Sequence, residues 1–151
     1  MPIPAQAVDP RKAFNYRIEI DGLLIALVRK VNVPKTEFGA VEHAHAGQRN
    51  MTKTAGKEII GDITLEKIYP EDGQDRYFSD WRALIKSGGA AAYKRTVDIF
   101  HLGPDETRVA HYVCTGCFPR EDEQGELDAM SEGDVILQTI VLSCDDVVQR
   151  L

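Results

Sequence analysis

Two of the three cysteines form a Cys-x-x-Cys pair, Cys114-Thr115-Gly116-Cys117, a spacing found in redox and zinc sites. A redox pair normally opens a helix, because the N-terminal dipole lowers the thiol pKa. Here the pair ends an expected strand and is followed by Pro119. A zinc site needs further ligands, for which the sequence offers Cys144, His101 and His111 at undefined spacing. We therefore predict neither metal binding nor redox catalysis.

Two interpretations of the cysteines stay open. They are either small apolar side chains of the core, or partners in a disulfide that forms only after assembly and exposure to an oxidising medium, since cytosolic thiols start reduced. The residues concerned are Cys114, Cys117 and Cys144.

The remaining candidates for chemistry are two histidines and an acidic cluster. His43 and His45 share a face of an extended segment, but no carboxylate or thiol at defined spacing completes a metal site. A cluster of acids on a linker is typical of a solvated edge; it comprises Glu121, Asp122, Glu123 and Glu126. No nucleophile stands beside a base, and no glycine-rich phosphate loop is present. We predict a protein without catalytic residues or cofactors.

Length and composition indicate a single domain spanning residues 1–151, with 43% hydrophobic and 28% charged residues. No apolar run reaches the roughly 18 residues of a membrane crossing, and Met1-Pro2-Ile3-Pro4 lacks the order of a signal peptide. We expect assembly in the cytoplasm and no membrane partner. The net charge of −6 disfavours stable binding to phosphates.

The elements expected to position these residues are mostly strands. From Phe14 to Asp21 apolar and polar residues alternate, Asp21-Gly22 is a hairpin turn, and a second strand follows from Leu23 to Val33. Residues 1–12 carry three prolines and are expected to form an extended N-terminal arm. Residues 35–60 form a polar insertion, flanked by strand signals at 36–41 and 58–68, that we expect to order on assembly.

A single helix is expected at about residues 74–87, after a cap at Asp72 to Asp75 and before the stop Ser87-Gly88-Gly89. Further strands are expected at 93–102, 108–118 and 134–144, and the acidic stretch 121–132 links the last two. The predicted fold is mainly β: an antiparallel sandwich or barrel of two packed sheets with one flanking helix. The predicted core comprises Phe14, Tyr16, Ile18, Ile20, Ile63, Leu65, Phe78, Trp81 and Leu84.

The order of several segments resembles a known family. Asp-Pro-x-x-x-Phe-Asn-Tyr-Arg-Ile-Glu-Ile-Asp-Gly-Leu spans residues 9–23, and the other segments are Lys30-Val31-Asn32, residues 61–67, Trp81-Arg82, Phe118-Pro119 and residues 132–136. Together they resemble the tail tube proteins of contractile phage tails and contractile injection systems, a superfamily that includes Hcp-like proteins. The insertion departs from the family pattern, because Ala44 to Arg49 replaces its glycine-rich stretch.

The resemblance implies a structural virion protein whose hexameric rings stack into the inner tail tube, a conduit for DNA ejection inside a contractile sheath. Its implied partners are other copies of itself, the sheath, baseplate and tail terminator proteins. The tape measure protein and genomic DNA would occupy the lumen without specific binding. Edge-to-edge joining of neighbouring sheets would close each ring and pair the open strand edges.

Within this picture, Glu19 and Glu66 are the predicted lumen-facing acids. Subunit and ring-stacking contacts are assigned to the N-terminal arm (residues 1–12), the insertion and the acidic stretch. The predicted contact residues are His43, His45, Gln48, Arg49, Asn50, Lys53 and Lys57.

Two alternatives remain open from the sequence. One is a tube protein of a secretion or extracellular contractile injection system that carries effectors. The other is a monomeric β-sandwich binding module, which would not self-associate at any concentration.

Overall fold

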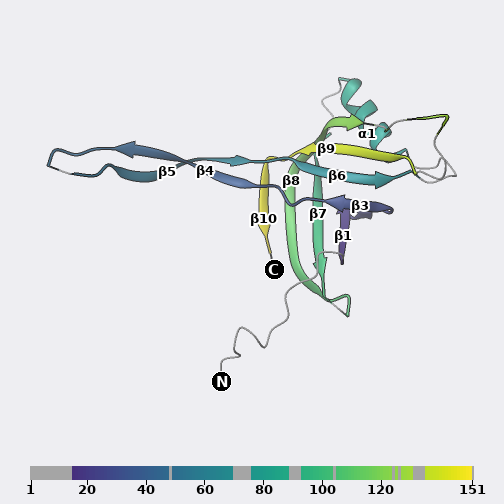
Figure 1. Ribbon diagram of the computed structural model, residues 1–151, viewed down its shortest axis with the longest axis horizontal. Helices are drawn as coiled ribbons and strands as arrows, with labels where there is room; N and C mark the ends of the chain where they lie inside the picture. Colours follow the sequence, from purple (N-terminus) through teal and green to yellow (C-terminus); the bar gives the residue numbers. More distant parts are fainter. Residues whose placement is uncertain are drawn as a thin grey trace.

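The computed structural model describes residues 15–47, 49–69, 76–88, 93–103, 105–123, 125, 127–130 and 135–150. Within these ranges, ten antiparallel strands and one helix form two packed sheets and a projecting hairpin (Figure 1). The predicted fold class is therefore confirmed, and the strand order of the described residues is open rather than closed into a barrel. The predicted N-terminal arm at 1–12 and the core candidate Phe14 lie outside the described residues.

The strands follow the order β2-β1-β7-β8-β9-β6-β3, with β10 paired to β8. What we call the β7 sheet contains β1 (Tyr16–Ile20), β2 (Leu23–Leu24), β7 (Arg95–Leu102), the first part of β8 (Arg108–Glu123) and β10 (Asp146–Gln149). The β6 sheet contains the last part of β8, β9 (Leu137–Ser143), β6 (Ile63–Ile68) and β3 (Val28–Val31).

Strand β8 belongs to both sheets and turns the corner between them. Its pairing with β7 shifts register between Arg95 and Val97, and its pairing with β9 shifts between Pro119 and Glu121. Gly116 lies at the corner with φ +66°, where a Cβ would lie 2.1 Å from Asp145 Oδ2. Bulges of this kind let a strand change sheets in a sandwich whose strands cross. In Figure 1, β7, β8 and β10 run across the direction of β6 and β9.

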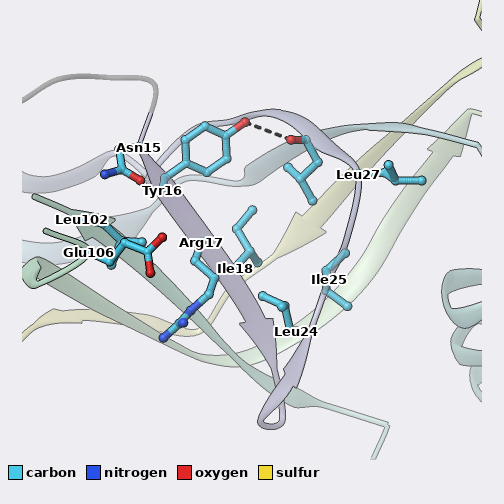
Figure 2. A pocket seen from close by; sticks show the side chains of 10 residues that line it. Asn15, Tyr16, Arg17, Ile18, Leu24, Ile25, Leu27, Leu102 and Glu106 are labelled. Atoms are coloured by element: carbon cyan, nitrogen blue, oxygen red, sulfur yellow. Dashed lines mark hydrogen bonds between the residues drawn. The ribbon is translucent and has the colours of Figure 1, made fainter. Parts of the chain in front are cut away.

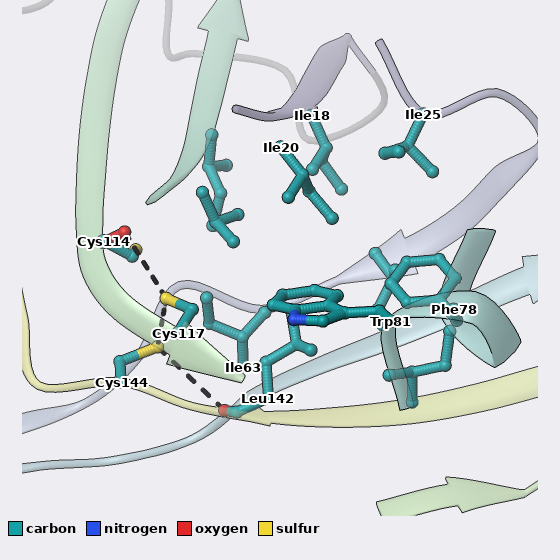
Figure 3. Packing of buried hydrophobic residues seen from close by; sticks show 14 residues of the cluster. Ile18, Ile20, Ile25, Ile63, Phe78, Trp81, Cys114, Cys117, Leu142 and Cys144 are labelled. Carbon is teal, nitrogen blue, oxygen red and sulfur yellow. Dashed lines mark hydrogen bonds between the residues drawn. The ribbon is translucent and has the colours of Figure 1, made fainter. Parts of the chain in front are cut away.

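The core lies between the sheets and is filled by alternate residues of their strands (Figure 3). Ile18 and Ile20 come from β1, Ile63 and Leu65 from β6, and all are at most 2% exposed. This alternation is what period-two side-chain placement requires. Tyr16 is half-buried at the rim, where its hydroxyl donates to the Val28 carbonyl at 3.1 Å.

Helix α1 (Tyr77–Lys86) closes one end of the core. Phe78 and Trp81 are 2% and 0% exposed, whereas Leu84 is half-buried. The Trp81 indole N–H donates to the Tyr93 carbonyl at 2.6 Å, which satisfies its buried polar atom. The helix ends at the predicted stop, where Gly88 adopts φ +66°. No helix in the described part of the chain is long and apolar enough to span a bilayer.

The first hairpin forms as predicted, but its second strand does not continue. Asp21 and Gly22 have φ of 49° and 82°, which bring Ile20 opposite Leu23. The chain then leaves the β7 sheet after two residues, takes a left-handed conformation at Leu27 (φ 61°) and joins the β6 sheet as β3. The uniformly apolar run 23–28 gave no sign of this crossing, since it contains residues suited to either sheet.

The insertion forms a two-stranded hairpin of β4 (Thr36–His43) and β5 (Thr52–Ile60), which we call the arm. It projects away from the two sheets (Figure 1). Strand β5 begins six residues before the predicted strand start at 58 and is separated from β6 by Gly61 and Asp62. Thr, Val and Ile favour extended backbone, and their spread along both strands explains the longer pairing. All residues of β4 are exposed.

Gly116→Ala is expected to lower the free energy of unfolding more than Gly88→Ala. Both glycines have φ +66°, so either alanine incurs the left-handed cost of about 1–2 kcal/mol. Only the Cβ at 116 would also collide with Asp145, because nothing lies within 4 Å of the site at 88. Urea denaturation measures both variants. Equal losses would contradict the tight packing proposed for the β8 corner.

Candidate assembly surfaces

The outer face of the β7 sheet carries charges of both signs. Cross-strand register places Glu19 opposite Asp98, and Arg17 opposite Phe100. His111 of β8 lies opposite Phe100, and its Nε2 is 2.9 Å from Asp98 Oδ1. The neighbouring carboxylates of Glu19 and Asp98 therefore lie beside a histidine whose ring nitrogen contacts one of them, Asp98.

Phe100 lies on this outer face yet is only 3% exposed. The His111 ring stacks on it with centroids 4.3 Å apart, and the guanidinium carbons of Arg108 and Arg17 lie 4.3 and 5.2 Å from its ring centre. Such cation–π and stacking contacts shield the aromatic ring from solvent. The outer face of the β7 sheet is therefore polar even at Phe100, because charged and polar side chains cover this ring.

The two predicted lumen acids lie in different sheets. Glu19 belongs to β1 in the β7 sheet, whereas Glu66 belongs to β6, opposite Thr139 of β9. Both are half-buried and alternate with core residues, so each lies on the outer face of its sheet. The outer faces of a two-sheet sandwich point in opposite directions. A bore lined by one face would therefore hold one of these acids and not both.

Both sheets end in edge strands, which pair with a neighbouring strand on one side only within the described part of the chain. In the β7 sheet these strands are β10 on one side and β1 with β2 on the other, and in the β6 sheet β3 is such a strand. Open edges present backbone donors and acceptors that another chain can pair with. The β7 sheet is therefore suited to edge-to-edge continuation on two sides.

The arm exposes large apolar side chains at a distance from the core. Phe38, Val41, Met51 and Ile59 are 64%, 52%, 60% and 59% exposed. Exposed apolar groups collected on one element mark an interaction surface. The ion pairs Lys35–Glu37 and Lys53–Glu42 are exposed and add little stability.

All but one of the predicted contact residues lie on the arm as exposed side chains. His43 ends β4, Lys53 and Lys57 belong to β5, and the His43 and His45 rings make an edge contact with centroids 5.1 Å apart. The exposed residues of this set are His43, His45, Arg49, Asn50, Lys53 and Lys57. Gln48 lies outside the described residues.

A groove of about 420 Å³ runs between β1 and the segment that joins β2 to β3 (Figure 2). Tyr16 and Ile18 line one side, and Leu24 and Leu27 line the other and are 54% and 49% exposed. Sequence reasoning missed this surface because it treated residues 23–33 as one strand. The positive φ at Leu27, which opens the groove, has no marker such as Gly or Asn in the sequence.

The acidic stretch is not a solvated edge along its whole length. Glu121, Asp122 and Glu123 belong to β8, and the Asp122 side chain is only 3% exposed. Arg82 Nη1 of α1 lies 3.1 Å from Asp122 Oδ2, and Gln138 Nε2 donates to Oδ1 at 2.9 Å. The expectation failed at Asp122 because β8 is longer than predicted, so this carboxylate falls on the inward face and ties the helix to the β6 sheet. Glu126 lies outside the described residues.

The three cysteines meet at the β8 corner. Cys114 and Cys117 are 0% exposed and Cys144 is 8% exposed, and Cys117 Sγ lies 3.2 Å from Cys144 Sγ (Figure 3). Of the histidines considered with them, His111 contacts Asp98 instead, and His101 lies opposite Tyr16 and Ala110 in the β7 sheet. Within the described residues no group of three His, Cys, Asp or Glu side chains is arranged to hold a metal ion.

Comparison with known families gives one match over most of the chain. The model of the family described as T4-like virus tail tube protein gp19 matches residues 12–148. No curated protein is similar enough to count as a match.

Solved structures share the fold at low sequence identity. A chain of the sheath–tube complex of the extracellular contractile injection system PVC, in the extended state, has a TM-score of 0.78 and 20% identity, with 93% of this chain and 91% of that chain covered. A chain of the tube-terminating cap of the anti-feeding prophage has a TM-score of 0.80 and 18% identity, with coverages of 98% and 99%. Hcp1 from Flavobacterium johnsoniae has a TM-score of 0.54 and 13% identity, with coverages of 91% and 95%.

Phe38→Ser is expected to change the free energy of unfolding by less than about 0.5 kcal/mol, because the side chain is 64% exposed on the arm. Ile63→Ala, in contrast, removes a 1% exposed core side chain and should cost about 2–5 kcal/mol. Denaturant titrations of the free chain compare the two variants. A large loss of unfolding free energy in Phe38→Ser would show that the arm packs on the core in the free chain and does not expose this side chain for a partner.

Proposed function

The chain belongs to the T4-like virus tail tube protein gp19 family, and from this premise we propose that its copies close into hexameric rings that stack into the inner tube of a contractile tail. The observation that carries the proposal is the family match, which extends over residues 12–148. The family consists of structural tube proteins and not of enzymes. Membership also favours a self-assembling subunit over a monomeric binding module.

Ring closure is assigned to the β7 sheet. Its terminal strands, β10 on one side and β1 with β2 on the other, differ from one another, so joining them between copies is a head-to-tail contact that closes when the rotation is one sixth of a turn. Each junction would replace backbone–water contacts by a strand ladder. Repetition around the ring makes the β7 sheets one continuous inner wall.

The outer face of the β7 sheet then lines the bore, with Glu19 and Asp98 directed into it. A ring of six copies would carry six times the chain's net charge of −6, and acids on the wall repel phosphate groups. Arg17 and Arg108 are held over Phe100, which limits their reach into the bore. Genomic DNA and a tape measure protein could pass such a wall without stable binding.

Stacking is assigned to the arm, to residues 1–12 and to the acidic stretch 121–132. The arm extends beyond the body of the subunit and carries uncovered apolar side chains such as Phe38, Val41 and Ile59. Burying each against another copy would contribute about 1.5–3 kcal/mol. In the free subunit the apolar side chains of the arm are exposed to solvent, and we expect polymerisation to begin on a template such as a baseplate.

The outer face of the β6 sheet, which carries Glu66, is the surface left for the sheath. This assignment is supported by the fold shared with a chain of a sheath–tube complex. The ends of the tube would meet baseplate and terminator proteins, and one similar chain is part of a tube-terminating cap.

The cargo separates two forms of the proposal. In the first, the tube belongs to a phage virion assembled in the host cytoplasm and conducts DNA at ejection. In the second, it belongs to an extracellular injection or secretion system and carries protein effectors, and the chain shares its fold with a chain of the PVC sheath–tube complex. Particles isolated from the source organism distinguish them, since the first form predicts nuclease-protected DNA in capsids joined to the tails and the second predicts tails without capsids.

Purified protein is expected to form annular particles or rods of uniform bore at high concentration or with a baseplate seed. Phe38→Ser should raise the concentration at which rods appear by about tenfold or more, since the lost burial is at least about 1.5 kcal/mol. Phe38→Leu is the matched control and should assemble like the wild type. Electron microscopy and sedimentation read both outcomes. A wild type that stays monomeric even with seeds would contradict the proposal.

Glu19→Lys tubes are expected to retain short duplex DNA inside the bore, in a form that resists nuclease and is released by salt, because the new cations bind phosphate. Glu66→Lys is the matched control, and any DNA that it binds on the outside should be digested. Co-sedimentation with and without nuclease gives the comparison. Protected DNA on Glu66→Lys tubes alone would assign the bore to the β6 sheet.

A further inference from the structure

The cysteine cluster lies where the two sheets are joined. Cys114 is paired with Val97 and Val147 in the β7 sheet, while Cys117 directly precedes Phe118, which is paired with Ser143 in the β6 sheet. Cys144 directly follows Ser143 and opens the turn between β9 and β10. A bond between Cys117 and Cys144 would thus connect the corner of β8 to the corner between β9 and β10.

The backbone on both sides of Cys117 and Cys144 is fixed by hydrogen bonds. The Phe118–Ser143 pair flanks them on one side, and the Asp145 N–H donates to the Thr115 carbonyl at 2.9 Å on the other. Antiparallel neighbours in this register have Cα separations within the range that disulfides accept. The 3.2 Å between the two Sγ atoms shows that the side chains already point at one another.

The thiols differ in their access to solvent and in their acidity. Cys144 is the one that reaches solvent, at 8% exposed against 0% for the others. Hydrogen bonds from Cys114 and Cys117 lower the pKa of Cys144 to about 4 against the opposing effect of burial. The same hydrogen bonds, together with burial, raise the pKa of Cys117 and of Cys114. Cys144 is therefore the most acidic of the three thiols, and the thiolate is the form that reacts with an oxidant.

We propose that Cys144 and Cys117 form a peroxide-sensitive thiol pair that closes into an intramolecular disulfide. The Cys144 thiolate attacks one oxygen of hydrogen peroxide, the O–O bond breaks, and the departing hydroxide takes up a proton as water. The product is a sulfenic acid on Cys144. The Cys117 sulfur then attacks that sulfur, the S–O bond breaks, and hydroxide leaves with the Cys117 proton as a second water. In total, two thiols are oxidised and one peroxide is reduced to two waters.

The Cys117–Cys144 disulfide would cross-link the sandwich at the β8 corner. The two cysteines are 27 positions apart, and a cross-link over a loop of this length removes conformational freedom from the unfolded chain. We expect the oxidised chain to melt about 10 °C higher than the reduced chain. This inference concerns the single folded chain, so it stands independently of tube assembly.

The test is a titration of the folded full-length chain with hydrogen peroxide, followed by peptide mapping without reductant. The expected product is a Cys117–Cys144 linkage, with a raised melting temperature that dithiothreitol reverses. Cys117→Ser should stop at the sulfenic acid of Cys144, which dimedone traps. Cys144→Ser should give neither product, and Cys114→Ser should still form the linkage.

Three outcomes would overturn the proposal. They are three free thiols after peroxide treatment of the wild type, a Cys114–Cys144 linkage in its place, or trapping of a sulfenic acid on Cys117. Circular dichroism of each variant before oxidation checks that it is folded. If a serine variant fails this check, the corresponding alanine variant and the wild-type peptide map still decide between the linkages.

Discussion

Strand β8 is shared between the two sheets, and this sharing determines where the other strands, the core and the open edges lie. Its first part pairs with β7 and β10, its last part pairs with β9, and the corner needs the positive φ of Gly116. Because β8 continues from one sheet into the other, it fixes the position of each sheet relative to the other. The terminal strands of both sheets lie elsewhere, at the surface. The core formed between them is held by ordinary apolar burial, so the open edges and outer faces are available for assembly.

This arrangement separates the tasks of the molecule among its parts. The β7 sheet has terminal strands on two sides and a polar outer face, which suits the inner wall of a ring. The β6 sheet is tied to α1 through Arg82 and Asp122 and offers an opposite face for other components. The arm carries apolar side chains that contribute little to the free subunit, as expected of an element that packs in the assembled state.

Local patterns in the sequence predicted much of the fold. Alternation gave the buried faces of β1 and β6, Asp21-Gly22 gave the first turn, and the spacing of Phe78 and Trp81 gave the helix. What escaped prediction depends on contacts distant in sequence or on unmarked backbone conformations. The crossing at Leu27 lacks a glycine, and the burial of Asp122 follows from the length of β8. The sequence left open which cysteines approach one another, because the contact of Cys117 with Cys144 requires the sheet register. The placement of Glu19 and Glu66 on opposite faces likewise needed the paired strands.

Edge-to-edge closure of the β7 sheet can be seen directly in a helical reconstruction by cryo-electron microscopy of rods assembled from the purified chain. We expect six subunits per ring, β7 sheets joined edge to edge around the bore with Glu19 facing it, and the arm of each subunit packed against another copy. Rods whose bore is lined by β3, β6 and β9, or whose arms extend into solvent, would contradict this expectation.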